Sequence, residues 1–113
     1  MITQLTQRRC SQACGAKSLS SAETDALLRE LGGGWSLAAG PRLGKEFRFP
    51  DFLQALAFVN KVGALAQEEN HHPDLQLAWG KVQVSLWTHS AGGLTENDFI
   101  LAAKIDALPG PAR

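Results

Sequence analysis

All three histidines of this 113-residue chain lie between positions 71 and 89, and His71 and His72 are adjacent. Imidazole suits proton transfer near neutral pH, because a histidine side chain ordinarily titrates near ~6.5. His71 and His72 follow a predicted helix, whose carboxyl end carries partial negative charge that favours a protonated ring. Pro73 biases His72 toward an extended backbone, so the two neighbouring rings diverge and can take different roles. If His89 converges with them, the three side chains form an acid–base site.

Other interpretations of the histidines remain open at this point. Adjacent histidines also occur in exposed polar loops, and His89 can be a capping residue. Three histidines that leave a position open for water would match a catalytic zinc site. Against zinc, His71 and His72 lack the i, i+4 spacing of helical ligands, and no obvious fourth protein ligand accompanies them.

The acidic residues near the histidines also have two interpretations each. Thr95 to Asp98 has the pattern of a capping box, in which Asp98 accepts a hydrogen bond from the Thr95 amide. Asp98 can instead orient a histidine, although the sequence favours the capping role. Glu68 and Glu69 lie at a predicted helix end, where solvated side chains are favoured over pairing with a histidine.

Three helices are predicted from caps and apolar spacing. The first spans about 20–31, from the Ser20–Glu23 capping box to a run of three glycines. The second spans about 50–69, with Pro50 in its first turn and Asn70 as its C-cap, and the third spans about 95–107. The second helix is recognised by apolar residues at helical spacing, namely Phe52, Leu56, Val59, Val62 and Ala66.

Four strands are predicted at 35–38, 45–49, 75–79 and 81–89, with a turn at 39–44. Val82, Val84 and Leu86 share one face of the last strand, and His89 ends it on the other face. We therefore expect an α+β domain over 19–108, after a flexible tail at 1–18. Its fold is a four-stranded antiparallel sheet with three helices packed on one face, in the order α-β-β-α-β-β-α.

Bulk properties exclude several classes of protein. Eleven basic and eleven acidic residues give a formal net charge of zero, which argues against binding to nucleic acid or an anionic membrane. No stretch approaches the roughly 20 apolar residues of a membrane span, and no signal peptide is visible. Cys10 and Cys14 are expected to be reduced thiols in the tail rather than half of a zinc site. We expect a cytoplasmic protein.

The segment around the histidines resembles the pterin-4a-carbinolamine dehydratases. Members carry a His-His-Pro segment after a helix and an aromatic residue some six positions after the proline. A third histidine follows ten positions beyond the aromatic residue, and an aspartate nine positions beyond that. Here these positions hold Pro73, Trp79, His89 and Asp98. The resemblance covers about residues 20–106.

The resemblance implies a dehydratase that converts 4a-hydroxytetrahydropterin into quinonoid dihydropterin. This reaction recycles the tetrahydrobiopterin cofactor of the aromatic amino acid hydroxylases, and one such hydroxylase is a candidate partner. The implied enzyme is a homodimer or homotetramer that uses no metal and no organic cofactor. The implied catalytic residues are His71, His72 and His89, and the implied substrate-binding residues are Asn70, Asp98 and Trp79. In our hypothesis His72 is the acid at the leaving hydroxyl, His71 is a base or clamp at the ring, and His89 binds and polarises the pterin.

One position departs from the family pattern. Members usually carry an ionisable residue four positions before the first histidine, where this chain has Gln67. The partner of the first histidine is then either a neutral amide or a shifted glutamate, Glu68 or Glu69.

Two other functions are compatible with the resemblance. Family members in animals also act as dimerisation cofactors of a homeodomain transcription factor, so a non-catalytic or regulatory partner is the main alternative. Action on a different pterin, for example in molybdenum-cofactor metabolism, is a third possibility.

Overall fold

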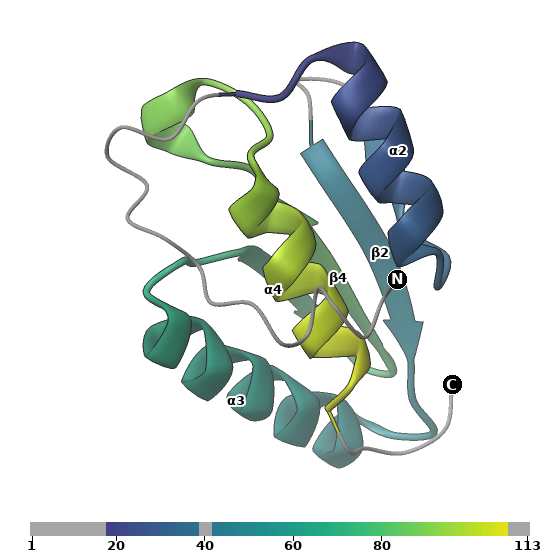
Figure 1. Cartoon of the computed structure of the whole chain (residues 1–113). Coiled ribbons are helices and arrows are strands. Elements are labelled where there is room, and N and C mark those ends of the chain that lie inside the picture. The colour runs from purple at the N-terminus through teal and green to yellow at the C-terminus, as the bar shows by residue number, and fades with distance from the viewer. Residues whose placement is uncertain (1–17, 39–41, 109–113) are drawn as a thin grey trace.

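The two faces of the sheet differ in burial, because side chains along its central strands point alternately to one face and the other. The structure is a computed structural model that describes residues 18–38 and 42–108. Helices α2 (Ser21–Leu31), α3 (Phe52–Glu69) and α4 (Glu96–Asp106) cover one face of a four-stranded antiparallel sheet (Figure 1). This arrangement confirms the predicted α+β fold. Cys10, Cys14 and nearly all of the predicted tail lie outside the described residues.

The sheet has the strand order β1-β2-β4-β3, so β1 and β3 are its edges. Its strands are β1 (Ser36–Ala38), β2 (Arg42–Arg48), β3 (Asp74–Ala78) and β4 (Lys81–Leu86). Leu43 pairs with Leu86 and Phe47 with Val82 across the two central strands. These side chains are buried under the helices, which is the burial pattern predicted for this face of β4.

Two strand boundaries differ from the prediction. β2 begins at Arg42, so the second half of the predicted turn at 39–44 belongs to a strand. β4 ends at Leu86, and His89 opens a short 3-10 helix, η1 (His89–Ala91). The chain closes on itself here, because Thr88 N donates to Gly93 O over 3.0 Å and Gly92 takes a left-handed conformation with φ 69°. The prediction that His89 ends a strand is therefore wrong.

Helix α3 begins at Phe52, two residues later than Pro50 suggests. Asp51 is the N-cap and accepts from Gln54 N over 2.8 Å, so Pro50 precedes the cap rather than lying in the first turn. Of the apolar residues that predicted the helix, Phe52 and Leu56 remain exposed. Phe58 faces the core instead, with its ring centroid 4.7 Å from that of Phe47. The helix is apolar on more than one face, so periodicity alone did not select the buried one.

The ends of α2 and α4 are defined by local and long-range contacts. Ser20 and Glu23 form the predicted capping box, and their hydrogen bonds hold the pKa of the Glu23 carboxyl below its ordinary value of 4.5. Asp106, at the end of α4, accepts from Trp35 Nε1 and from Lys45 Nζ, each over 2.8 Å. These bonds tie the end of α4 to β2 and the turn after α2. In the described part of the chain, no helix is long and apolar enough to cross a bilayer.

Candidate active site

The end of α3 places His71 against the protein interior. Asn70 takes the left-handed conformation, with φ 56°, and is the predicted cap. His71 N donates to Ala66 O over 3.1 Å, and Asn70 N donates to Gln67 O over 3.3 Å. This paired arrangement is a Schellman motif, which reverses the chain direction at a helix end. As a result His71 is 6% exposed, whereas the neighbouring His72 is exposed.

His71 forms a buried pair with Asp98 on α4. The distance from His71 Nε2 to Asp98 Oδ1 is 2.7 Å, and the aspartate is 0% exposed. A carboxylate only accepts hydrogen bonds, so Nε2 carries the proton and Nδ1 is left to accept or bind a second one. Asp98 also accepts from Thr95 N over 2.9 Å. It therefore combines the two roles that were alternatives on sequence, the capping box and the orientation of a histidine.

Asp98 is fully buried, and its expected role in substrate binding stays a prediction. A side chain with no exposed surface cannot contact a ligand in the pocket without rearrangement. Its Oδ1 contact fixes the orientation of the His71 ring. Thr88 Oγ1 donates to Asp98 Oδ2 over 2.9 Å and lies 2.8 Å from Thr95 Oγ1, so the aspartate belongs to a buried polar network.

His72 has a separate partner on the last turn of α3. Its Nε2 lies 3.1 Å from Gln67 Oε1, and the amide oxygen is an acceptor, so Nε2 donates. Gln67 is thus the partner of the second histidine rather than the first. Glu69, one of the two shifted glutamates, accepts from Lys104 Nζ over 2.6 Å.

His89 packs on an aromatic side chain at the rim of the same region. The ring centroids of His89 and Trp87 are 4.3 Å apart at an interplanar angle of 53°. Arg42 Cζ lies 4.8 Å from the Trp87 ring centroid, and its Nη1 pairs with Asp74 Oδ2 over 3.0 Å. Arg42 of β2, paired with Asp74 of β3, therefore packs on the Trp87 ring, which in turn contacts the His89 ring.

The three histidines share one pocket of about 350 Å³. Its wall is formed by Asn70, His71, His72, Pro73, Asp74, Trp87, Thr88 and His89. The end of α3, the start of β3 and the segment after β4 meet here, so three imidazoles converge as the chemistry requires. Within the described residues, no three His, Cys, Asp or Glu side chains are grouped as ligands for a metal ion.

The two remaining candidates for substrate binding lie in different places. Asn70 is exposed in the wall of the pocket. Trp79 lies in the turn between β3 and β4, at the opposite end of β3 from His72, and is 69% exposed. The structure therefore does not bring Trp79 to the histidines of its own chain, and its contact with substrate stays a prediction.

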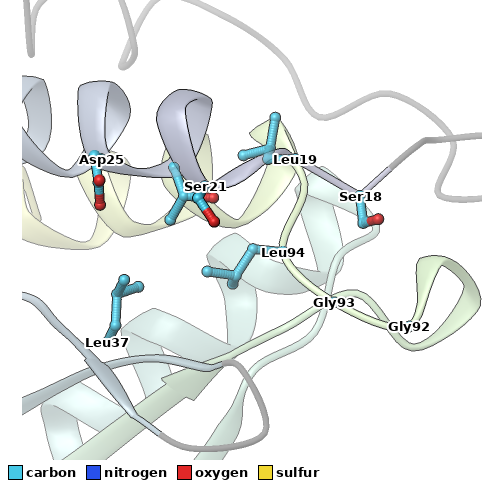
Figure 2. A pocket seen from close by; sticks show the side chains of 9 residues that line it. Ser18, Leu19, Ser21, Asp25, Leu37, Gly92, Gly93 and Leu94 are labelled. Atoms are coloured by element: carbon cyan, nitrogen blue, oxygen red, sulfur yellow. The ribbon is translucent and has the colours of Figure 1, made fainter.

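A second pocket, of about 290 Å³, lies between the start of α2, β1 and residues 92–94. Figure 2 shows Ser21 and Asp25 on α2 directed toward Leu37 and Leu94. It has no histidine in its wall. The paired imidazoles are the groups suited to proton transfer near neutral pH, so the candidate active site is the histidine pocket.

Sequence reasoning missed three contributors to the site. Thr88 was assigned only to one face of a strand, Trp87 was interpreted as a core or interface residue with ring stacking as the alternative, and Lys104 was not considered. The signal for Thr88 and Trp87 was their position directly before the candidate histidine, in the segment Trp87-Thr88-His89. Lys104 gave no comparable signal, because its contact with Glu69 depends on how α3 and α4 pack.

Comparisons with known proteins show the family of the chain. A sequence profile of the family described as "Pterin 4 alpha carbinolamine dehydratase" matches residues 17–108. The chain is 51% identical over 94 residues to a Rickettsia bellii protein named "Putative pterin-4-alpha-carbinolamine dehydratase", covering 83% of each chain.

Two solved structures resemble the fold. One is a "transcriptional coactivator/pterin dehydratase" from Brucella melitensis, with a TM-score of 0.75, 35% identity and coverage of 80% of this chain and 97% of that one. The other is described as a pterin dehydratase-like protein and a RuBisCO assembly factor in the alpha-carboxysome. It has a TM-score of 0.57, 28% identity and coverage of 68% and 90%.

Proposed function

Because the chain belongs to the pterin 4 alpha carbinolamine dehydratase family, we propose that it removes water from 4a-hydroxytetrahydropterin by histidine acid–base catalysis. The observation that carries the proposal is the Asp98–His71 pair beside a pocket that also contains His72 and His89. The product is quinonoid dihydropterin, and the enzyme is a hydro-lyase.

The reaction needs two proton transfers at neighbouring atoms of the substrate. The bond between C4a and its hydroxyl oxygen breaks, and a proton delivered to that oxygen lets it leave as water. A proton departs from the adjacent ring nitrogen, whose electron pair forms the new double bond to C4a. Protons and electrons balance without an oxidant, a reductant or a metal, so a pocket of imidazoles is sufficient.

The contacts of each ring suggest its role. His71 Nε2 is held by Asp98, which leaves Nδ1 as the atom for accepting the ring proton, and Asp98 stabilises the imidazolium that results. His72 is exposed at the pocket and retains the role of acid at the leaving hydroxyl. His89, supported by Trp87, binds and polarises the flat heterocycle. Each well-placed acid or base contributes about 10²–10⁴-fold to the rate.

Recycling of tetrahydrobiopterin for an aromatic amino acid hydroxylase is the physiological setting that we propose. The hydroxylase itself remains a predicted partner. Family membership supports a pterin as the substrate. No residue identified in the pocket selects a particular side chain on the pterin.

A stopped-flow assay of carbinolamine dehydration tests the proposal with the variants H71A, H72A and H89A. We expect the wild type to exceed the spontaneous decay and each variant to lose about 10²-fold or more. Q76A is the matched control, since Gln76 is exposed on β3 and outside the pocket wall. Near-normal rates in both H72A and H89A would contradict the assignment.

A non-catalytic scaffold is the second candidate. It is favoured by the names of the two structural relatives, one a coactivator and one an assembly factor. It is also consistent with an exposed apolar surface on α3. An unchanged decay rate with added wild-type protein would favour the scaffold over the enzyme.

A further inference from the structure

We propose that Thr88 is a positioning residue of the site, whose hydroxyl holds the Asp98 carboxylate in the orientation that His71 requires. This inference rests on the proposed function, because it concerns the same imidazole. Thr88 lies in the pocket wall between Trp87 and His89, but its hydroxyl points into the buried network behind His71.

The hydrogen bonds of this network have only one consistent set of directions. Asp98 N donates to the Thr95 carbonyl oxygen over 3.1 Å, and Thr95 N donates to Asp98 Oδ2 over 2.9 Å. Thr88 donates its single hydroxyl proton to Asp98 Oδ2, because a carboxylate oxygen can only accept. Because Thr88 has no second hydroxyl proton, the Thr95 hydroxyl is the donor to Thr88 Oγ1, at 2.8 Å.

The two oxygens of Asp98 are thereby divided between two tasks. Oδ2 accepts from Thr88 Oγ1 and from Thr95 N, each over 2.9 Å, and Oδ1 accepts from His71 Nε2 over 2.7 Å. Rotation of the carboxylate would break both bonds to Oδ2. Thr88 thus resists the one motion that would misplace the acceptor of the His71 proton.

Burial makes the hydroxyl difficult to replace. Thr88 is 1% exposed, Thr95 is 2% exposed and Asp98 is 0% exposed. A buried carboxylate that loses a donor has no solvent to compensate for the lost hydrogen bond. Loss of the Thr88 hydroxyl also leaves Thr95 without the acceptor for its proton. Both effects loosen the support of His71, and small displacements of a catalytic group reduce rates strongly.

The variants T88V, T88A and T88S separate the hydroxyl from the shape of the side chain. T88V keeps the shape and removes the hydroxyl. T88A and T88S both lose the methyl group, so they differ only in the hydroxyl and remain informative if T88V does not fold. T24V is the matched control for a buried threonine, because Thr24 lies on α2 outside the histidine pocket.

Two measurements are made on the full chain. In the dehydration assay we expect T88V and T88A to lose roughly 10- to 100-fold in kcat with little change in KM, while T88S and T24V stay close to wild type. In proton NMR, the His71 Nε2–H resonance should exchange with solvent faster in T88V and T88A than in wild type and T88S. D98N identifies that resonance by shifting it.

The proposal is overturned if T88A matches T88S in both kcat and His71 proton exchange, even where both are less stable than wild type. The NMR measurement does not depend on turnover. A wild type that fails to dehydrate pterin carbinolamine, but shows the expected exchange pattern, therefore contradicts the proposed function and leaves the role of Thr88 supported.

Discussion

At the scale of single residues, the site is organised by the different partners of two adjacent histidines. His71 is buried and bonded to a carboxylate, whereas His72 is exposed and bonded to the neutral amide of Gln67. One imidazole is thus bonded to a carboxylate, and the imidazole of the next residue is bonded to a neutral amide. This asymmetry is consistent with different roles for the two rings in one pocket.

Replacement of Gln67 by glutamate tests the role of His72. In Q67E a carboxylate should accept the His72 Nε2 proton and favour the imidazolium, because opposite charges nearby stabilise each other. If His72 is the acid, the dehydration rate of Q67E should exceed that of wild type several-fold at alkaline pH and converge with it at acidic pH. The pH profile of kcat measures this difference.

Q67A is the companion variant, since it removes the hydrogen bond without adding charge. It should be slower than wild type at every pH. Superimposable profiles for Q67E and wild type would show that His72 does not supply the proton.

At the scale of elements, the His71–Asp98 pair depends on how the end of α3 is held against α4. His71 and His72 directly follow the C-cap of α3, and α4 carries Asp98, so a shift between the helices would separate His71 from Asp98. Glu69 and Lys104 join the same two helices over 2.6 Å, with side chains 4% and 14% exposed. Their ion pair therefore fastens the two elements next to the site.

Removal of Lys104 alone should lower the free energy of unfolding more than removal of both Glu69 and Lys104. K104M separates Glu69 from this cation, and breaking a buried pair in this way costs roughly 3–5 kcal/mol. E69L/K104M replaces both charges with apolar side chains and should recover much of that loss. Urea unfolding gives the free energies, and equal stability of the single and double variants would contradict the coupling.

At the scale of the whole molecule, one surface of α3 is left apolar. Phe52, Leu53 and Leu56 form this α3 outer row, and Leu53 is 73% exposed. Contiguous exposed apolar side chains are common where proteins associate. Together with a formal net charge of zero, the row supports the prediction that the chain forms a homodimer or homotetramer.

Introduction of a charge into the α3 outer row should weaken self-association. L53E places a carboxylate where a second copy would bury an apolar side chain, so we expect a smaller species in analytical ultracentrifugation. Because Leu53 is exposed in the single chain, its unfolding free energy should change by less than about 0.5 kcal/mol. A26E adds the same charge at an exposed position of α2 and is the control. An unchanged mass for L53E would exclude this row as the interface.

The sequence alone was sufficient to predict the helices, the order of the elements and the choice of the histidines as candidate site residues. Capping boxes at Ser20 and Thr95 and the left-handed Asn70 are local features, because their hydrogen bonds join residues within one turn of each other. The alternation of apolar residues along β4 is local as well. Local patterns of this kind depend on the segment itself and not on the fold around it.

Only the tertiary structure decided which groups meet. His71 and Asp98 lie 27 positions apart, and Glu69 and Lys104 lie 35 apart, so their pairing depends on the packing of α3 against α4. The buried face of α3 was likewise selected by the shape of the core, since the helix is apolar on more than one side. Long-range contacts are made by packing, which short-range periodicity does not encode, and they determined that Asp98 faces a histidine while Trp79 lies far from all three.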